Sequence, residues 1–375
     1  MTDYYFRTED LIVGYSGKPL ISEINLRLKK GGIMTLIGPN GSGKSTILKS
    51  ITKHLEMIAG VVYISKDNLL ELSAKETAAK ISVVLTERIR PELMTCGEVV
   101  ELGRYPYTNH FGKLTDEDKA IVKDSLEKVN GVELADKPFD AVSDGQRQRI
   151  MLARAICQKP EIIVLDEPTS FLDIRYKIEL LEILGRMAKE GVTIIMSLHE
   201  IDLAQKVSDL VVCVNGDKIP HMGEPHEIFT KDIINGLYGI NEGAYNLHFG
   251  SIELGKPTGV PKTFVLAGGG NGIPFFRALQ RNNVPFYAGI IFDNDIDYQL
   301  SISLAHEVIG CQAFAPVAAS ILEQALAALS GCEYLIDCGT EIREYNIHNA
   351  KILDAAKGLN IKVITGIQEI GEVFS

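Results

Sequence analysis

The stretch GPNGSGKST at residues 38–46 decides the fold of this chain. It fits the pattern G-x-x-x-x-G-K-S/T, and it stands between an apolar run at 33–37 that predicts a strand and a segment at 46–55 whose apolar spacing predicts a helix. Glycines allow backbone N–H groups to close around a phosphate, and the start of the helix adds partial positive charge. A glycine-rich turn with a solvent-facing lysine would not need this strand and helix beside it. The sequence therefore predicts a nucleotide-binding loop.

The residue types inside the loop suggest a role for each position. Lys44 is expected to neutralise phosphate oxygens, which makes it both a nucleotide-binding and a catalytic residue. Ser45 is expected to offer its hydroxyl group to Mg²⁺. The expected nucleotide-binding residues of the loop are Gly38, Pro39, Asn40, Gly41, Ser42, Gly43, Lys44, Ser45 and Thr46.

A second motif predicts hydrolysis of the bound nucleotide. The run IIVLDE at 162–167 is an apolar strand that ends in two adjacent acids. Asp166 is expected to hold Mg²⁺ and Glu167 to polarise the water that attacks the γ-phosphate, because phosphoryl transfer depends on positioning and charge stabilisation. His199 follows the next predicted strand and could contact the γ-phosphate or hold Glu167, although a single histidine is more often structural. An acidic pair alone is weak evidence, so this prediction depends on the phosphate loop.

Composition and charge exclude several classes of protein. The 375 residues carry a net charge of −11 without a Lys/Arg-rich stripe, so nucleic acid is not an expected partner. No apolar run approaches the ~18 residues of a membrane-spanning helix, and the N-terminal MTDYYFRTED lacks the features of a secretory signal. The six cysteines form no CxxC pair, which favours buried free thiols. We therefore expect a protein that stays in the cytoplasm.

The pattern along the chain predicts two domains. A mostly helical segment at 90–159 interrupts the strands of a parallel sheet in the first domain. The stretch GKPTGVPK at 255–262 predicts a linker, so the domains are expected to span residues 1–255 and 256–375. In the second domain, the expected strands are 263–267, 286–292, 334–337 and 362–365, and the expected helices are 275–282, 298–308, 318–329 and 345–356.

A glycine-rich turn in the second domain suggests a dinucleotide fold. The run GGGNG at 268–272 ends a predicted strand and opens a helix, and Asp293 ends the next strand, where an acid could bind a ribose hydroxyl group. Ile273 stands where the third glycine of the G-x-G-x-x-G pattern would be. Ligand binding and a merely structural turn both remain open.

A third motif identifies a family. The run VSDGQRQRIMLARAI at 142–156, ahead of the strand that bears Asp166, resembles the signature of ABC ATPases. The resemblance covers about the first 250 residues, with the motifs in the family order. It implies an α/β fold: a P-loop ABC ATPase core with an antiparallel β subdomain and a helical subdomain. Here a smaller Rossmann-like α/β domain follows that core.

The resemblance also implies that ATP is bound between two protomers. Ser143 and Gly145 of one protomer, with Gln146 beside them, would contact the γ-phosphate held by the phosphate loop of the other. Tyr15 resembles the aromatic residue that stacks on adenine, although it could be a core residue. Asp173, in SFLD at 170–173, resembles the acid that links the two sites.

Within the family, GRYPY at 103–107 together with VSDGQRQR is similar to importers of iron-siderophore, haem or cobalamin complexes. This similarity implies a homodimer of ATPase subunits that works with two membrane-spanning permease subunits and an extracytoplasmic substrate-binding protein. The chain would then lie at the cytoplasmic face of the cell membrane. Which substrate is transported does not follow from the sequence.

Two positions depart from the family pattern. Asp144 replaces the usual glycine of LSGGQ, a change that related importers often tolerate. Thr86, in VVLTER, stands where the family places a glutamine that contacts Mg²⁺ and senses the membrane partner. Thr86 is therefore a candidate Mg²⁺-binding residue, and Glu87 beside it could take this role instead.

Two alternative functions are compatible with some of these motifs. One is a soluble ABC switch without a transporter, which would be expected to carry a long coiled coil or two ATPase halves. The other is a ligand sensor in the second domain that regulates the ATPase.

Overall fold

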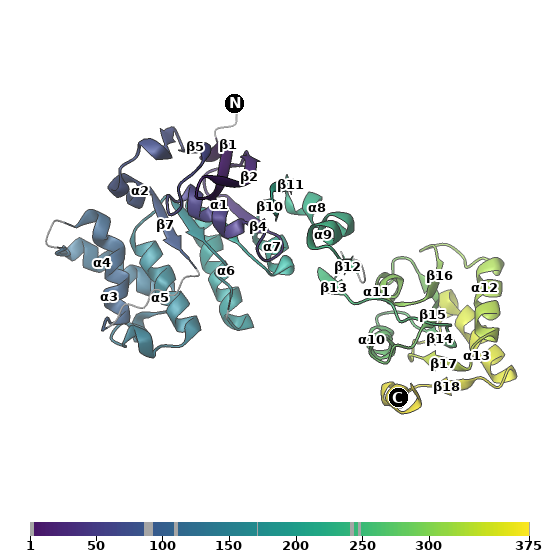
Figure 1. Ribbon diagram of the computed structural model, residues 1–375. Helices are drawn as coiled ribbons and strands as arrows, with labels where there is room; N and C mark the ends of the chain where they lie inside the picture. The colour runs from purple at the N-terminus through teal and green to yellow at the C-terminus, as the bar shows by residue number, and fades with distance from the viewer. Residues whose placement is uncertain are drawn as a thin grey trace. The chain divides into compact units, whose positions relative to one another are not determined.

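The computed structural model describes residues 4–85, 93–108, 112–170, 172–240, 244–246 and 249–374. These residues form two compact units, Met1–Tyr238 and Gly239–Ser375 (Figure 1). The division falls before the linker expected at 255–262. Its position follows from contacts of the intervening segment: Asn246 donates to the backbone oxygen of Gln299 at 3.2 Å, and Glu253 is ion-paired with Arg277 at 2.9 Å.

A six-stranded sheet forms the centre of the first unit, in the order β11-β10-β4-β9-β8-β7. All neighbouring strands are parallel except β10 and β11. Every residue of β4, β8 and β9 is buried, which explains their continuous apolar runs, because parallel strands are usually covered on both faces. The strands are β4 (Ile33–Ile37), β7 (Ile81–Val84), β8 (Ile162–Leu165), β9 (Thr193–Ser197), β10 (Leu210–Asn215) and β11 (Lys218–Gly223).

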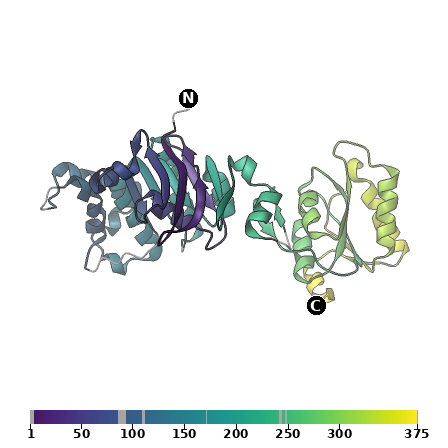
Figure 2. The same cartoon turned by 45° about the horizontal axis from the view of Figure 1, so that its top comes forward.

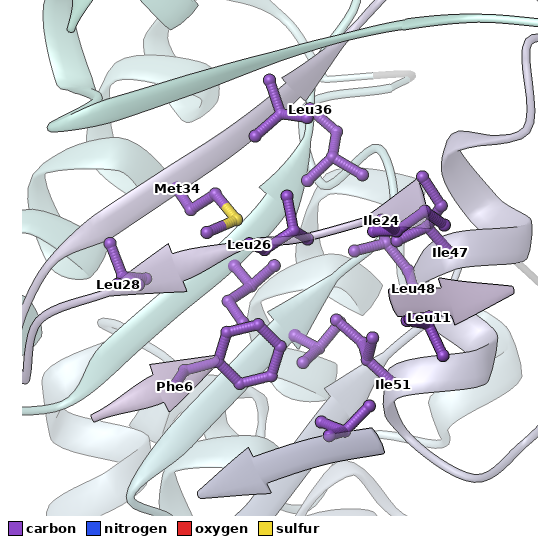
Figure 3. Packing of buried hydrophobic residues seen from close by; sticks show 14 of the residues in the cluster. Phe6, Leu11, Ile24, Leu26, Leu28, Met34, Leu36, Ile47, Leu48 and Ile51 are labelled. Carbon is purple, nitrogen blue, oxygen red and sulfur yellow. The ribbon is translucent and has the colours of Figure 1, made fainter. Parts of the chain in front are cut away.

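An antiparallel sheet covers helix α1 (Lys44–Ile51). Phe6 and Leu11 of this sheet belong to one apolar cluster with Met34 of β4 and with Ile47 and Ile51 of α1 (Figure 3). This packing fixes the helix that follows the phosphate loop against the strand that precedes it. The strands of the sheet are β1 (Phe6–Tyr15), β2 (Lys18–Ile24), β3 (Arg27–Leu28), β5 (Ala59–Ile64) and β6 (Asp67–Asn68).

A helical subdomain lies between β7 and β8 in the chain, as the sequence predicts. Arg104 of the GRYPY motif is buried within it and donates to Asp118 at 2.9 Å and to the backbone oxygen of Cys157 at 2.8 Å. The motif therefore ties three segments of the subdomain together. These helices are α3 (Cys96–Glu101), the 3₁₀ helix η2 (Leu102–Tyr107), α4 (Asp116–Lys128), the short turns η3 (Val132–Leu134) and η4 (Phe139–Ala141), and α5 (Asp144–Cys157).

The remaining helices of the first unit connect or flank the two sheets. They are η1 (Leu69–Glu71), α2 (Ala74–Lys80), α6 (Ile174–Lys189), α7 (Ile201–Val207), α8 (Pro225–Ile228) and α9 (Lys231–Tyr238).

The second unit is a five-stranded parallel sheet in the order β16-β15-β14-β17-β18, with helices on both faces (Figure 2). One apolar core lies under α10, α11 and α14, and the other lies under α12 and α13. A two-stranded ribbon, β12 (Ala244–Asn246) and β13 (Ser251–Glu253), precedes the sheet. The strands are β14 (Thr263–Leu266), β15 (Phe286–Phe292), β16 (Glu307–Cys311), β17 (Tyr334–Asp337) and β18 (Lys362–Ile364). The helices are α10 (Ile273–Arg281), α11 (Ile296–Leu304), α12 (Ala319–Ser330), η5 (Glu344–Asn346), α13 (His348–Gly358) and α14 (Ile367–Phe374).

The two-unit α/β fold confirms the predicted class, and one expected element is wrong. The helix expected at 298–308 ends at Leu304, and the edge strand β16 follows at Glu307–Cys311. The chain leaves the helix where the backbone N–H of His306 donates to Phe286 of β15 at 2.9 Å, so pairing with the sheet replaces the last turn. All six cysteines are buried free thiols, as predicted. No helix among the described residues is both long and apolar enough to span a lipid bilayer.

Candidate functional site

The phosphate loop adopts a conformation that its glycines make possible. Gly38 has a φ of 147°, and a Cβ atom at this position would lie 2.1 Å from the backbone oxygen of Val214. Gly43 has a φ of 99° and precedes the first residue of α1. Both angles lie in a region that side chains other than glycine rarely adopt. Between them the backbone curves around the start of the helix, where a phosphate would bind.

Lys44 closes the loop from inside. Its Nζ atom donates to the backbone oxygens of Gly38 at 2.8 Å and Pro39 at 3.0 Å. Burial lowers the pKa of Lys44, and the nearby carboxylates of Glu167 and Asp166 act in the opposite direction. The ammonium group is therefore positioned in the loop, with two backbone oxygens that phosphate oxygens can replace as partners.

Two side-chain hydroxyl groups, those of Ser42 and Tyr15, lie in or beside the phosphate loop. The Oγ atom of Ser42 is buried and has no hydrogen-bond partner among the residues described. A buried hydroxyl group without a partner costs free energy, which a ligand with an acceptor oxygen would recover. The hydroxyl group of Tyr15 lies 3.1 Å from Oγ1 of Thr46, and the Tyr15 side chain is half exposed, so it does not belong to the core.

Asp166 and Glu167 follow strand β8 and face the end of β9. The hydroxyl group of Ser197 donates to Oδ1 of Asp166 at 2.7 Å and accepts from the backbone N–H of Glu167 at 2.8 Å. Asp166 is buried, and Glu167 has a φ of 49°, which turns its side chain away from the course of the strand. The two acids therefore occupy different environments although they are adjacent.

The structure brings His199 to the carboxylate of Glu167. Its Nε2 atom lies 2.5 Å from Oε1 of Glu167, and the hydroxyl group of Ser170 lies 3.3 Å from Oε2. Both side chains of the His199 pair remain partly exposed. Of the two roles expected for His199, contact with the γ-phosphate and positioning of Glu167, the geometry supports the second directly.

The signature residues lie at the N-terminus of α5. Ser143 caps this helix by accepting from the backbone N–H of Gln146 at 3.3 Å, and Gln146 in turn accepts from the N–H of Ser143 at 3.0 Å. In the described part of the chain, no hydrogen bond or ion pair joins Ser143, Gly145 or Gln146 to the phosphate loop of the same protomer. Asp144, the departure from the family pattern, is ion-paired with Arg147 at 2.8 Å on the helix surface.

Of the two remaining predicted site residues, Asp173 lies in the described part of the chain and Thr86 does not. Asp173 caps α6, because its Oδ1 atom accepts from the backbone N–H of Tyr176 at 3.0 Å. Thr86 and Glu87 lie outside the described residues.

The donor set fits Mg²⁺ bound together with a nucleotide. No group of three or more His, Cys, Asp and Glu side chains in the described residues could hold a metal ion by itself. Mg²⁺ commonly binds one or two protein oxygens together with phosphate oxygens. Ser45 and Asp166 would supply those protein oxygens.

Several residues at the site carry no motif in the sequence. Ser197 links the two acids, and its only signal is its place two residues before His199 at the end of a strand. Glu200 accepts from Thr169 at 2.8 Å and is ion-paired with Lys177, which fixes the segment after His199 to the start of α6. Side-chain partners at these separations depend on the folded sheet, so the sequence alone does not reveal them.

In the second unit, a carboxylate of the protein itself occupies the N–H groups of the glycine-rich turn. The buried carboxylate of Asp297 accepts from the backbone N–H groups of Gly270 and Gly272 at 3.1 and 3.0 Å and of Ile273 at 3.1 Å. Burial raises the pKa of Asp297, and these N–H groups act in the opposite direction. Asp293 accepts from the N–H of Ala313 at 2.9 Å. The N–H groups of Gly270, Gly272 and Ile273 are therefore not available to a pyrophosphate, which supports the alternative of a structural turn.

Two families match this chain. Residues 21–170 match the family described as ABC transporter, and residues 286–372 match the MJ0874 family. The first match contains the phosphate loop, the signature and both acids, and the second lies inside the sheet-containing part of the second unit.

Individual relatives extend the first match. An uncharacterized ABC transporter ATP-binding protein of Methanocaldococcus jannaschii, MJ0873, is 41% identical over 76% of this chain and 98% of its own length. The iron(3+)-hydroxamate import ATP-binding protein FhuC of Bacillus subtilis is 37% identical over 62% of this chain and 87% of its own length. The cobalamin import ATP-binding protein BtuD of Halobacterium salinarum is 27% identical over 85% of this chain and 80% of its own length.

Solved structures show the same fold in the first unit. The structure of cbiO1 from Clostridium perfringens, part of the ABC transporter complex cbiONQ, is 28% identical with a TM-score of 0.54. It covers 62% of this chain and 93% of its own chain.

Proposed function

Because this chain belongs to the ATP-binding proteins of ABC transporters, we propose that it hydrolyses ATP to drive import of an iron-siderophore, haem or cobalamin-type cargo through separate membrane subunits. The observation that carries the proposal is the convergence of Lys44, Asp166, Glu167 and His199 at the carboxyl ends of neighbouring strands. The cargo class comes from relatives that import iron hydroxamate and cobalamin.

The phosphate loop would bind ATP through its backbone N–H groups and Lys44. Tyr15 stands at the edge of the loop, beside Thr46, where its exposed ring could stack on adenine. Ser45 and Asp166 would hold Mg²⁺, which supplies charge stabilisation at the β- and γ-phosphates when it is bound. Ser197 keeps Asp166 oriented for this role.

Glu167 would orient and polarise the attacking water. Its carboxylate is held between His199 and Ser170, so it loses little freedom when the water binds. His199 would keep that carboxylate aimed at the γ-phosphate. Positioning of this kind contributes to phosphoryl transfer, where the protein performs little covalent chemistry.

A complete site would require a second copy of the chain. Ser143 and Gly145 stand at the exposed N-terminus of α5, whose partial positive charge suits a phosphate. We assign them to the ATP of the partner protomer, as the resemblance of residues 142–156 to the ABC signature implies. Asp173 at the start of α6 would lie at the same interface.

A groove in the first unit would receive the permease. It has a volume of about 630 Å³ and lies between the end of α1, helix α2, the 3₁₀ helix η2 and helix α5. Leu102 and Tyr105 line it and are 46% and 75% exposed, which leaves apolar surface for a segment of another protein. Strand β7 also borders the groove through Ile81 and Val83. Docking here would hold the chain at the cytoplasmic face of the membrane.

Reconstitution tests this function. The purified chain should hydrolyse ATP with Mg²⁺, and co-reconstituted permease subunits should raise that rate. The double variant Leu102→Arg with Tyr105→Ala should reduce this stimulation at least about 10-fold, as expected when a central apolar contact is lost. Lys123→Ala, on the exposed face of α4, is the control and should leave the stimulation unchanged. Full stimulation of the double variant would refute the docking groove, and absence of hydrolysis in the presence of permease would refute the function.

A further inference from the structure

A cavity lies where the strand order of the second unit reverses. The chain runs from β14 through β15 to β16 on one side of the sheet, and then returns to β17 and β18 on the other side. Ligands of open parallel sheets bind outside the carboxyl ends of the strands at this reversal. A cavity of about 270 Å³ is found there, between Gly268 and Gly269 after β14 and Thr340 and Glu341 after β17.

The charges around the cavity are unfavourable for phosphate. Asp295 and Glu341 line it, and Asp297 fills the N–H cradle at the start of α10 directly behind the loop. Among the described residues that line the cavity, the one basic side chain, Arg343, is ion-paired with Glu341 at 2.5 Å. A phosphate group would meet like charges without a free donor cradle, so the ligand is expected to be uncharged or cationic.

Asn349 points to a ligand independently of these acids. It is 4% exposed and lines the cavity from the first turn of α13, and its side-chain amide makes no hydrogen bond to the described residues. An amide that lines a cavity and has no protein partner can bind a ligand that carries both a donor and an acceptor. The neighbouring Asn346 is also buried, but it donates to Glu341 and accepts from Arg343 within its own loop. The unused amide of Asn349 is thus available to a ligand.

The other walls suit a flat ring and a sugar. Ile290, Ile291 and Phe292 supply an apolar side, and the ring of Tyr345 lies 6.2 Å from that of Phe292 at the cavity edge. Asp295 accepts one backbone N–H on each oxygen, from Gly269 and Asp297. A carboxylate has about four lone-pair sites, so each oxygen can still accept a hydroxyl hydrogen.

We propose that this cavity binds a nucleoside without a phosphate group, with the ribose hydroxyl groups on Asp295, the base against Phe292 and Tyr345, and a base edge on Asn349. The cavity of about 270 Å³ is smaller than the about 300–1,000 Å³ typical of sites for drug-sized ligands, so its size favours a single nucleoside over a dinucleotide. The site is separate from the ATP site of the first unit and does not depend on the proposed transport function.

A tryptophan reporter can test the proposal in the full chain. The sequence contains no tryptophan, so Tyr345→Trp places a single one at the cavity edge. This variant is titrated with adenosine, guanosine, cytidine and uridine, each in saturating ADP to fill the phosphate loop. At least one ribonucleoside should give a saturable fluorescence change. Its 5′-monophosphate should bind about 10-fold more weakly because of the surrounding acids.

Second substitutions on this background locate the ligand. Asn349→Ala should raise the Kd of the nucleoside about 10-fold, which is the usual effect of losing one good hydrogen bond to a buried partner. Asn271 lies at the exposed rim of the same cavity, where a substitution does not endanger folding, and Asn271→Ala should also raise the Kd. Lys351→Ala, exposed on the same helix as Asn349, is the control and should leave the Kd unchanged. The proposal is overturned if no ribonucleoside binds, if monophosphates or NAD bind as well as nucleosides, or if neither asparagine variant weakens binding.

Discussion

The Nε2 atom of His199 lies 2.5 Å from Oε1 of Glu167, and this contact connects the segments that follow strands β8 and β9. The pair sits at one edge of the sheet because parallel neighbouring strands present their carboxyl ends together. A histidine that the sequence leaves without a definite role is thereby linked to the acid that orients water. The first two predictions separate the contributions of these residues.

Replacement of Glu167 by glutamine should slow ATP hydrolysis without removing ATP binding. The amide keeps the size of the side chain but cannot polarise the water as a carboxylate does, and loss of a general base typically costs about 100-fold or more in rate. The phosphate cradle around Lys44 is unchanged, so ATP should hold the closed dimer. Single-turnover hydrolysis and size-exclusion chromatography with ATP measure the two effects. Turnover at the wild-type rate would refute the role of Glu167.

Replacement of His199 by alanine should lower the hydrolysis rate about 10-fold or more while the Kd of ATP stays close to that of the wild type. The Glu167 carboxylate would lose its partner at 2.5 Å and sample unproductive orientations. Hydrolysis rates and ATP titrations of the same preparation give both values. His226→Ala is the matched control, because His226 is exposed and remote from the acids in the sequence. An unchanged rate for His199→Ala would assign this histidine a structural role only.

Replacement of Lys44 by alanine should weaken ATP binding itself, by about 10- to 100-fold. The substitution removes the buried cation nearest to the phosphates, and hydrogen bonds to charged groups contribute about 1.5–3 kcal/mol each. Equilibrium titration with a fluorescent ATP analogue measures this change. Lys49→Ala, on the same helix, provides a comparison outside the loop. Wild-type affinity in Lys44→Ala would contradict the assignment of Lys44.

The parts of the site that sequence predicts are those whose chemistry restricts residue type and order. A loop that surrounds a phosphate with backbone requires the positive φ angles of Gly38 and Gly43 and the burial of Lys44. The apolar runs of β4 and β8 follow from burial on both faces of a parallel sheet. These constraints are local in the chain, so a short motif contains them.

The features that sequence does not reveal depend on contacts between distant segments. Ser197 acquires its role only when β9 pairs with β8, and Asp297 only when α11 packs beside the loop after β14. The strand β16 resembles a continued helix in the sequence because its apolar residues fit either periodicity. Likewise, the ribbon at residues 244–253 looks like the end of the first domain until its contacts place it with the second.

Replacement of Asp297 by alanine should loosen the glycine-rich turn of the second unit. Three N–H groups, of which that of Gly272 is buried and the other two are partly buried, would lose their acceptor. A buried unsatisfied group costs about 1–3 kcal/mol, so local opening should become at least about 10-fold more frequent. Hydrogen exchange of a peptide that covers residues 268–275 measures the opening. Asp354→Ala, exposed on α13, should not change it. Unchanged protection in Asp297→Ala would show that the N–H groups find other partners.

The buried pair of Arg104 and Asp118 should make the stability of the helical subdomain depend on acid pH. Hydrogen bonds from Thr115, together with the one from Arg104, lower the pKa of Asp118 from 3.8 to about 2. Because the folded pKa lies below the unfolded value, the stabilisation is fully present above about pH 4 and is lost as the pH falls through about 2. Asp118→Asn leaves Arg104 buried without its counter-charge. Near neutral pH, the free energy of unfolding of this variant should be lower than that of the wild type by about 3 kcal/mol or more. Urea unfolding of both proteins should show this difference narrowing below about pH 4, whereas Asp124→Asn, exposed on the same helix, should differ little from the wild type at any pH. A gap between the wild type and Asp118→Asn that stays constant from neutral to acid pH would mean that the charge of Asp118 does not stabilise the subdomain.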